Sequence, residues 1–266
     1  MQGAKQKLST EEELFCTKYE LKIISGVMNQ GQLERWVPGC CSPHTHKEHE
    51  SRYSWVKNFV KDKNVLDVAC GAGFGSYIIA EDGAAAKVTG WDIDKDTIHY
   101  ASIKNRHPNI SFEVKNAETF DTNQQYDVIV SFETIEHLSR PDFFLNSTTR
   151  ALTVGGVCFI STPISNIEEN IRPDNMFHQR EWGFKKFHEL VEKYLRIEEV
   201  YLQLYSNPPG MKRGFFSKVL QKAGLSGVHK QQVIEKLTPF KWDPRELKEE
   251  VIGTEWTGYQ ILKCSK

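Results

Sequence analysis

Short apolar runs alternate with helical patterns through the middle of the chain. Five runs rich in β-branched and aromatic side chains occur between Asn64 and Ser161, namely NVLDVAC, KVTGWDI, ISFEV, YDVIVSF and GGVCFIS. Such runs are typical of strands that are covered on both faces. Helical patterns separate them, as in GSYIIAED, KDTIHYASIKN and PDFFLNSTTRAL. Regular alternation of strand and helix predicts an α/β fold with a doubly wound, mostly parallel sheet.

The segments on either side of this core predict further elements. IEEVYLQLYS and GYQILKC are strand-like and bring the expected sheet to seven strands. Ser9 with Glu12, and Thr10 with Glu13, are candidate capping boxes for an N-terminal helix that runs toward Met28. The alternation is interrupted before the last strand, where we expect a helical cap over the strand ends. The predicted organisation is an N-terminal helical or lid segment at 1–55, an α/β core at 56–206, a cap or substrate insertion at 207–255 and the last core strand at 256–266.

Composition limits the classes of protein to which the chain can belong. The 266 residues include 34 Lys and Arg against 35 Asp and Glu, so a formal charge of −1 provides no general basic surface for nucleic acid. No apolar stretch approaches the ~20 residues of a membrane span, and the first residues contain no apolar signal region. The six cysteines lack the spacing of a disulfide framework. We therefore expect a cytoplasmic protein with reduced thiols.

Alternating glycines connect the first predicted strand to the helix that follows it. In VLDVACGAGFG, the residues Gly71, Gly73 and Gly75 allow a tight turn and a close approach of the backbone to a ligand. Ser76 stands where the dinucleotide fingerprint G-x-G-x-x-G would require glycine. Asp67 precedes the loop and can hold an ammonium group. The loop therefore favours a cofactor that carries an amino acid over a nicotinamide cofactor.

Polar side chains also follow the second and third predicted strands. Asp92, with Asp94 as the neighbouring alternative, can accept hydrogen bonds from both hydroxyls of a ribose. Asn116, Ala117 and Glu118 come just past the third strand, where an amide and backbone groups can meet the edge of an adenine. Each turn could serve turn chemistry alone. Three such turns after successive strands favour a common ligand.

These motifs resemble a known enzyme family. VLDVACGAGFG, GWDID, KNAETF and YDVIVSFETIEHL, between about Lys63 and Pro163, are similar in order and spacing to the cofactor motifs of class I S-adenosylmethionine-dependent methyltransferases. The resemblance implies a Rossmann-like methyltransferase fold that binds S-adenosylmethionine. HKEHESRYSWV resembles the E-H-x-x-R-Y segment of many bacterial members, which places Arg52 and Tyr53 over the cofactor, and Asn116 stands where the family usually has Asp. The cofactor contacts that the resemblance implies are Tyr53, Asp67, Ala69, Gly71, Gly73, Asp92, Ile93, Asn116, Ala117 and Phe132.

The stretch SFETIEHLS, at the end of the fourth strand, combines two carboxylates with an imidazole. On a helical turn, Glu133, Glu136 and His137 would stand at i, i+3 and i+4 and share one face. A purely structural role is one explanation, because acidic residues favour a helix start and a histidine can satisfy a nearby carbonyl. Otherwise Glu133 could position the amino-acid part of the cofactor, or His137 or Glu136 could act as general base toward a hydroxyl. A third role is a divalent cation, such as Mg²⁺, held by Glu133, Glu136, His137 and His178.

Two resemblances bear on the acceptor. The E-x-x-E-H pattern is similar to that of small-RNA 3′-terminal 2′-O-methyltransferases, and His178 in FHQREWGFKKF resembles a histidine of that family and of surface-sugar methyltransferases. We expect methyl transfer to a hydroxyl of a sugar, glycan or other small molecule, with Glu136, His137 and His178 as catalytic residues. RNA 2′-O-methylation with a metal is one alternative, and the near-zero net charge argues against it. A cofactor-binding protein without turnover is the other, and the intact pair Glu136 and His137 argues against that.

Overall fold

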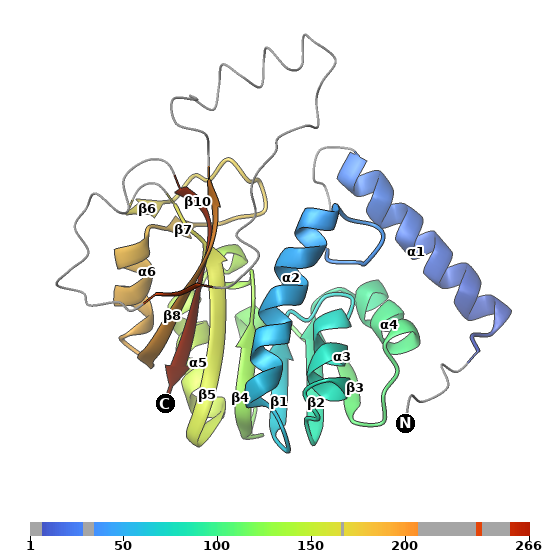
Figure 1. Ribbon diagram of the computed structural model, residues 1–266, viewed down its shortest axis with the longest axis horizontal. Coiled ribbons are helices and arrows are strands. Elements are labelled where there is room, and N and C mark those ends of the chain that lie inside the picture. Colours follow the sequence, from blue (N-terminus) through green and yellow to red (C-terminus); the bar gives the residue numbers. More distant parts are fainter. Residues whose placement is uncertain (1–6, 29–34, 166–167, 207–237, 241–255) are drawn as a thin grey trace, which may run out of the picture.

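A computed structural model describes residues 7–28, 35–165, 168–206, 238–240 and 256–266 (Figure 1). An eight-stranded sheet lies at its centre. In order across the sheet, the strands are β3 (Ile110–Val114), β2 (Lys87–Asp92), β1 (Asn64–Val68), β4 (Tyr126–Ser131), β5 (Leu152–Pro163), β10 (Trp256–Ser265), β8 (Arg196–Ser206) and β9 (Thr238–Phe240). The first five are parallel, β10 is antiparallel to both of its neighbours, and β9 is antiparallel to β8. The predicted doubly wound, mostly parallel sheet is confirmed, and β9 adds a short strand at its edge.

Helices cover both faces of the sheet. They are α1 (Thr10–Met28), α2 (Pro43–Val56), α3 (Phe74–Glu81), α4 (Lys95–Lys104), α5 (Pro141–Ala151) and α6 (Phe184–Val191). One face is covered by α2 and α3, the other by α5 and α6, and α1 packs against α4 (Figure 1). Apart from β9, the expected cap at 207–255 lies outside the described residues. Within the described parts of the chain, no helix combines the length and the apolar character that crossing a membrane requires.

The N-terminal helix begins with the first of the two candidate capping boxes, Ser9 with Glu12. Ser9 N donates to Glu12 Oε2 at 2.8 Å, and Glu12 N donates to Ser9 Oγ at 3.3 Å. Two backbone N–H groups at the start of α1 are thereby satisfied by side chains. Further along, Tyr19 stacks on Tyr100 of α4 with ring centroids 4.4 Å apart. The capping box thus starts a helix whose buried side is fixed against the core.

Alternate residues of the central strands face opposite helical layers. Val65 and Leu66 of β1 are both fully buried. Val65 packs in the cluster that contains Ile79 of α3, whereas Leu66 packs in the cluster that contains Phe144 of α5. Because both faces are covered, these strands need no alternation of polar and apolar residues, and this explains why their sequences are largely apolar.

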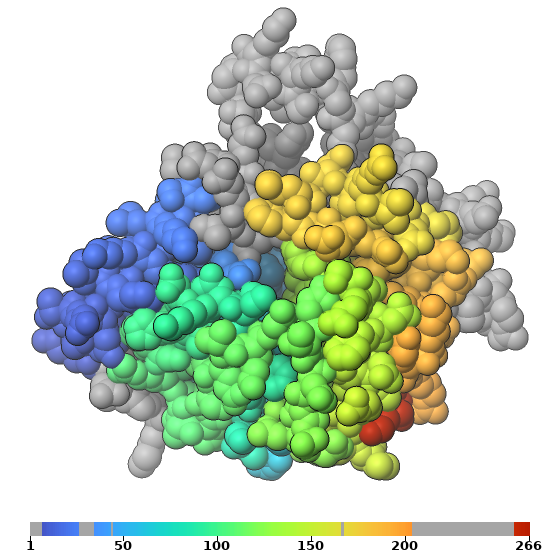
Figure 2. Space-filling view, turned by 180° about the vertical axis from the view of Figure 1, so that it is seen from behind, coloured from blue at the N-terminus to red at the C-terminus, as the bar shows by residue number. Residues whose placement is uncertain are grey.

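The parallel arrangement brings the carboxyl ends of the first five strands to one edge of the sheet, at the top of Figure 1. Two short 3₁₀ helices follow strands there, η2 (Ala117–Thr119) after β3 and η3 (Ile135–His137) after β4. A separate two-stranded sheet of β6 (Glu169–Asn170) and β7 (Glu181–Trp182) lies above this edge. In Figure 2 its segment, in yellow, lies against the green surface formed by residues after β4. The loops at this edge carry the predicted site residues.

Candidate cofactor and acceptor site

The glycine loop between β1 and α3 is packed closely from two sides. Gly71 and Gly73 have positive φ angles of 55° and 81°, which favour glycine. A Cβ on Gly73 would lie 2.6 Å from the ring of Phe112, and a Cβ on Gly75 would lie 2.1 Å from the ring of Tyr53. Tyr53 of α2 therefore lies directly on the start of α3, and only glycine leaves room for it there.

Asp67 is fully buried beneath this loop. One carboxylate oxygen accepts a hydrogen bond from the Tyr53 hydroxyl at 3.1 Å, and the other accepts from the Ser76 hydroxyl at 2.6 Å. Burial raises the pKa of Asp67 to about 7, although the two hydroxyls act in the opposite direction. Ala69 then turns the chain into the loop with a positive φ of 57°. Asp67 thus ties β1 to α2 and α3 and holds the loop in shape.

Asp92 ends β2 with its carboxylate at the carboxyl edge. Its Oδ2 accepts from Gly71 N at 3.1 Å, and its Oδ1 accepts from Asp94 N at 2.9 Å. Nη2 of Arg35, which was not among the predicted residues, also donates to Oδ1 at 3.4 Å. The alternative, Asp94, accepts from Thr97 N at 2.7 Å and caps α4. Asp92 is therefore the carboxylate that faces the glycine loop.

Asn116 and Ala117 lie after β3 at the same edge. Asn116 Oδ1 accepts from Glu118 N at 2.9 Å and starts η2, while Ala117 packs against the core. Ile93, directly after Asp92, is 61% exposed, which is a large fraction for an apolar side chain. An exposed apolar group beside a carboxylate and an amide loop provides the kind of surface that a nucleoside requires.

Glu133 departs from the predicted helical face. It has a positive φ of 52° and precedes η3. Its Oε1 lies 2.8 Å from Nη1 of Arg52 and accepts from the Ser161 hydroxyl at 2.7 Å. Burial raises the pKa of Glu133, and Arg52 opposes that rise. Because Arg52 and Ser161 hold this carboxylate toward α2 and β5, Glu133 does not share one helical face with Glu136 and His137.

Arg52 is the centre of a buried polar cluster below the edge. Its side chain is fully buried, and its guanidinium carbon lies 4.6 Å from the ring centroid of Tyr259 and 5.9 Å from that of Phe132. Glu48 lies one turn earlier on α2, and burial raises its pKa to about 7, with Arg52 opposing the rise and Glu133 adding to it. One guanidinium thus pairs with Glu133 and acts to lower the pKa of both carboxyl groups, and the cluster joins α2 to the segment after β4, to β5 and to β10.

Three predicted catalytic residues converge at the end of β4. Glu136, His137 and His178 each offer a ligand atom, and these atoms all lie within 4.8 Å of one another. Glu136 is fully buried, and the two imidazole rings meet edge to face with centroids 4.8 Å apart. Backbone bonds hold the two segments together, because Gln179 N and Arg180 N donate to the carbonyl oxygen of Glu136 at 2.8 and 3.2 Å. Glu133 lies outside this group.

Each histidine of the cluster has a defined partner on its Nδ1 atom. His137 Nδ1 lies 3.0 Å from the Phe177 carbonyl oxygen, and His178 Nδ1 lies 2.6 Å from Oε1 of Glu181. The amide nitrogen of Asn175 lies 3.0 Å from Nε2 of His178. Glu181 and Asn175 were not predicted from the sequence, although their spacing of three residues on either side of His178 was a possible signal.

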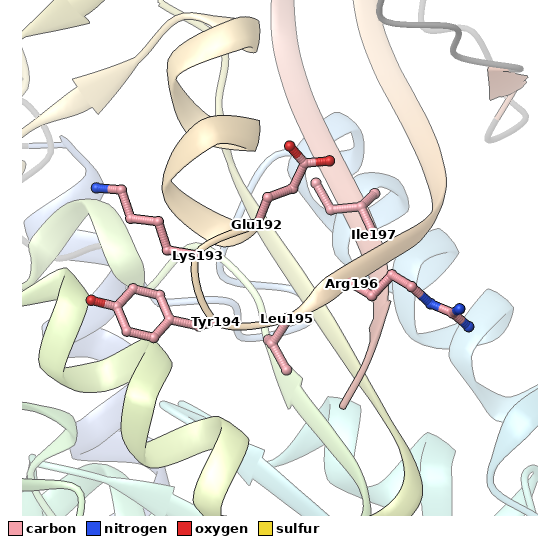
Figure 3. A pocket seen from close by; sticks show the side chains of 6 residues that line it. All are labelled: Glu192, Lys193, Tyr194, Leu195, Arg196 and Ile197. Carbon is pink, nitrogen blue, oxygen red and sulfur yellow. The ribbon is translucent and has the colours of Figure 1, made fainter.

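A surface pocket elsewhere in the molecule does not belong to this site. It is lined by residues 192–197, one continuous segment that runs from the end of α6 into the first residues of β8 (Figure 3). β8 runs in the same direction as β5, because both are antiparallel to β10, so the start of β8 lies at the amino edge of the sheet. The pocket is therefore at the opposite edge from the predicted site and contains none of its residues.

Curated relatives match part of this chain. A protein of Mycolicibacterium smegmatis named "Probable S-adenosylmethionine-dependent methyltransferase" is 33% identical over 163 residues, which cover 60% of this chain and 62% of that protein. A "Ubiquinone biosynthesis O-methyltransferase" of Pelagibacter ubique is 30% identical over 144 residues, covering 48% of this chain and 59% of the relative. The chain thus spans about three fifths of the length of each.

Solved structures share the fold at low sequence identity. The [4+2]-cyclase SpnF has a TM-score of 0.58 at 14% identity, with 99% of both chains covered. The N-methyltransferase NodS from Bradyrhizobium japonicum, in complex with S-adenosylhomocysteine, has a TM-score of 0.51 at 15% identity, covering 70% of this chain and 89% of NodS. A cyclase and a methyltransferase on one architecture show that these likenesses establish the fold alone.

A family model adds sequence evidence to that likeness. The model described as "Methyltransferase domain" matches residues 59–201, from the 3₁₀ turn before β1 into β8. This range is more than half of the chain and includes the glycine loop, Asp92, Asn116 and the Glu136 cluster. By this match, the chain belongs to the methyltransferase-domain family.

Proposed function

We propose that the protein transfers a methyl group from S-adenosylmethionine to a hydroxyl oxygen of a small molecule or sugar. The observation that carries this proposal is the convergence of Glu136, His137 and His178 at the same sheet edge as the glycine loop and Asp92. The O-methyltransferase named among the relatives supports oxygen as the acceptor atom. S-adenosylmethionine supplies an activated methyl group on its sulfonium, so the protein must align the acceptor, exclude water and accept one proton.

The residues after β1, β2 and β3 fit such a cofactor. Asp92 would accept hydrogen bonds from the ribose hydroxyls, and Ile93 with the loop at Asn116 would flank the adenine. Asp67 has both oxygens engaged by hydroxyl groups, so we assign it to shaping the glycine loop, whose backbone N–H groups would meet the amino-acid part. Tyr53 would close the site from the side of α2.

The acceptor side requires a group that takes the hydroxyl proton. His137 is suited to this role, because its Nδ1 faces a carbonyl oxygen and Nε2 is then the basic nitrogen. Glu136 is fully buried in the same cluster and would favour the positive charge that forms on an imidazole. His178, on the loop between β6 and β7, would orient the acceptor.

A divalent cation is a second candidate at the same cluster. Both imidazoles have a hydrogen-bond acceptor at Nδ1, the arrangement that metal-ligating histidines almost always have. Two nitrogens and one carboxylate oxygen suit Mn²⁺, Fe²⁺, Co²⁺ or Zn²⁺ better than Mg²⁺, which prefers oxygen ligands. When bound, such a cation would lower the pKa of an acceptor hydroxyl. Glu136, His137 and His178 would hold it.

A screen with radiolabelled S-adenosylmethionine tests the function. The chain is offered phenols, sugars, amines and a short RNA, after chelation and with Mn²⁺, Zn²⁺ or Mg²⁺ restored. We expect label on a hydroxyl oxygen of a small molecule. Label only on nitrogen or carbon would overturn O-methylation, and label only on RNA would favour the metal-dependent RNA alternative. Binding of S-adenosylhomocysteine with no transfer to any class would support a cofactor-binding protein without turnover.

A further inference from the structure

We infer that the loop from Asn175 to Glu181 sets both histidines of the acceptor cluster in one tautomer, with the proton on Nδ1 and the lone pair on Nε2. The role of this tautomer in methyl transfer rests on the proposed function, whereas the assignment of the tautomer rests only on the hydrogen bonds described below. Asn175 and Glu181 are thereby positioning residues for His178, and the Phe177 carbonyl has the same effect on His137.

The orientation of the Asn175 amide is the first step. Phe177 N donates to the Asn175 side-chain oxygen at 3.0 Å, which fixes the oxygen and leaves the amide nitrogen on the other side. That nitrogen lies 3.0 Å from Nε2 of His178. An amide NH₂ group can only donate, so Nε2 must be the unprotonated nitrogen.

Glu181 leads to the same result from the other side of the ring. Its Oε1 lies 2.6 Å from Nδ1 of His178, and the side chains of His178 and Glu181 are only 8% and 20% exposed. An ionised carboxylate only accepts hydrogen bonds, so Nδ1 must carry the proton. A bond to a charged acceptor is also stronger than a neutral one. Two independent contacts therefore assign one tautomer to His178.

His137 takes the same tautomer from the backbone of this loop. Its Nδ1 lies 3.0 Å from the Phe177 carbonyl oxygen, and a carbonyl can only accept. The loop is held in place by Gln179 N and Arg180 N, which donate to the Glu136 carbonyl oxygen. A single segment thus positions both rings against η3.

The consequence is a pair of basic nitrogens beside a carboxylate. A general base and a cation ligand both need an unprotonated ring nitrogen, so this tautomer serves either form of the proposed site. The Asn175 amide donates to Nε2 of His178, and it must move or share that atom when an acceptor hydroxyl or a cation binds. Asn175 therefore fixes the His178 ring before binding, and its amide leaves or shares Nε2 when the acceptor hydroxyl or the cation binds.

The test is nitrogen-15 NMR of the histidine side chains in the full chain at about pH 8.5, where an ordinary imidazole is neutral. His137→Gln and His178→Gln assign the two signals. We expect both rings to show the Nδ1–H tautomer, whereas a free imidazole favours Nε2–H. Glu181→Gln keeps an oxygen acceptor and should preserve the His178 pattern. Glu181→Leu leaves the Asn175 amide in place, so the pattern should be lost only when Glu181→Leu is combined with Asn175→Ala. Glu169→Gln is the matched control, because Glu169 lies on β6, pairs with Arg180 at 3.0 Å and contacts no histidine among the described residues.

A transfer assay separates this inference from the proposed function. Glu181→Leu should lower kcat by about 10–100-fold with little change in the KM of S-adenosylmethionine, and Glu181→Gln should recover most of that loss. An Nε2–H signal for His178 in the wild type, or an unchanged signal in the double variant of Glu181→Leu and Asn175→Ala with folding verified by the amide spectrum, overturns the inference. If the tautomers are as inferred but His178→Gln transfers methyl groups at the wild-type rate, the inference stands and the proposed role of the cluster fails.

Discussion

In the loops after β1, β2 and β3, the contacts that shape the site often join residues close in sequence. Asp92 bonds the backbone of Asp94, and Asn116 bonds the backbone of Glu118, each two residues away. At the acceptor cluster, the contacts of His178 with Asn175 and Glu181 are local, but those that join η3 to the loop at 175–181 are distant in the chain. His137 meets the Phe177 carbonyl across 40 residues. We call these regions the cofactor half, formed by the loops after β1, β2 and β3, and the acceptor half, formed by η3 and the loop at 175–181.

Cofactor binding and acceptor choice are thereby assigned to two parts of the molecule that are built in different ways. The cofactor half is formed by strand ends and tight turns, so it is determined by the sheet itself. The acceptor half is formed by a connection that rests on η3 through a few hydrogen bonds, and such loops can change without disturbing the sheet. Cofactor binding and acceptor choice should therefore respond to different substitutions.

Removing the basic nitrogen of the acceptor half should have the largest effect. His137→Ala is expected to slow transfer by ~10²–10⁴ in single-turnover assays while leaving calorimetric affinity for S-adenosylhomocysteine unchanged. His107→Ala is the control, because His107 pairs with Glu81 outside the cluster. A parallel loss of cofactor affinity in His137→Ala would break the separation of the two halves.

The same variant distinguishes a base from a cation. With a metal-free base, a chelator has no effect, and rising pH restores His137→Ala because an ionised acceptor no longer needs the base. With a cation, chelation abolishes transfer, and Glu136→Ala, His137→Ala and His178→Ala each weaken metal binding.

The buried cluster between the halves should dominate stability. Arg52→Met leaves the Glu133 carboxylate buried without its guanidinium, and we expect a loss of ~3–5 kcal/mol in the free energy of unfolding. Urea unfolding measures this loss. Arg52→Met combined with Glu133→Gln should recover part of it, because no unpaired charge remains. Equal free energies of unfolding for Arg52→Met and the wild type would show that the pair of Arg52 and Glu133 does not stabilise the protein.

In the cofactor half, Asp92→Ala should weaken binding of S-adenosylhomocysteine about tenfold or more. The lost ribose bonds to a charged group are worth ~1.5–3 kcal/mol. Asp94→Asn is the control, since asparagine also caps helices and this variant should keep both α4 and the affinity. Weaker binding in Asp94→Asn with normal binding in Asp92→Ala would instead assign the ribose contact to Asp94.

Two buried carboxyl groups, that of Glu48 beside Arg52 and that of Asp67 beneath the glycine loop, should make the free energy of unfolding fall as pH rises. The pKa values of Glu48 and Asp67 are raised to about 7, so the folded state keeps a proton that the unfolded chain has released above about pH 4. The free energy of unfolding should therefore decline between about pH 4 and 7, by at most ~1.4 kcal/mol per pH unit for each group. Glu48→Gln and Asp67→Asn should each flatten the decline, measured by urea unfolding across this range. An unchanged slope in both would show that the two groups are ionised when folded.

The parts that sequence reasoning predicted follow local rules. The capping box of Ser9 and Glu12 depends on residues three apart, and the strand-end turns depend on a repeating strand–helix order. Glu133 was expected on a helical face, but its position is set by Arg52 and Ser161, which are 109 residues apart. Such distant contacts leave no periodic signal in a sequence. Glu181 is a different case, because it lies three residues from His178 and that spacing was a possible signal.

The smallest expected effect on cofactor binding is that of replacing Arg35, whose guanidinium contacts Asp92 of the cofactor half. Oδ1 of Asp92 has room for two hydrogen bonds, and Asp94 N and Arg35 supply both. A ribose hydroxyl that needs Oδ1 must therefore displace the guanidinium. Because a partly exposed ion pair is worth ~0.2–1 kcal/mol, Arg35→Met should tighten S-adenosylhomocysteine binding by about 1.5–5-fold at low salt. Added salt should narrow that difference, since it screens the pair in the wild type. Arg106→Met, which removes the partner of Glu12, is the control and should not alter binding. Weaker binding in Arg35→Met would instead make Arg35 a direct contact of the cofactor.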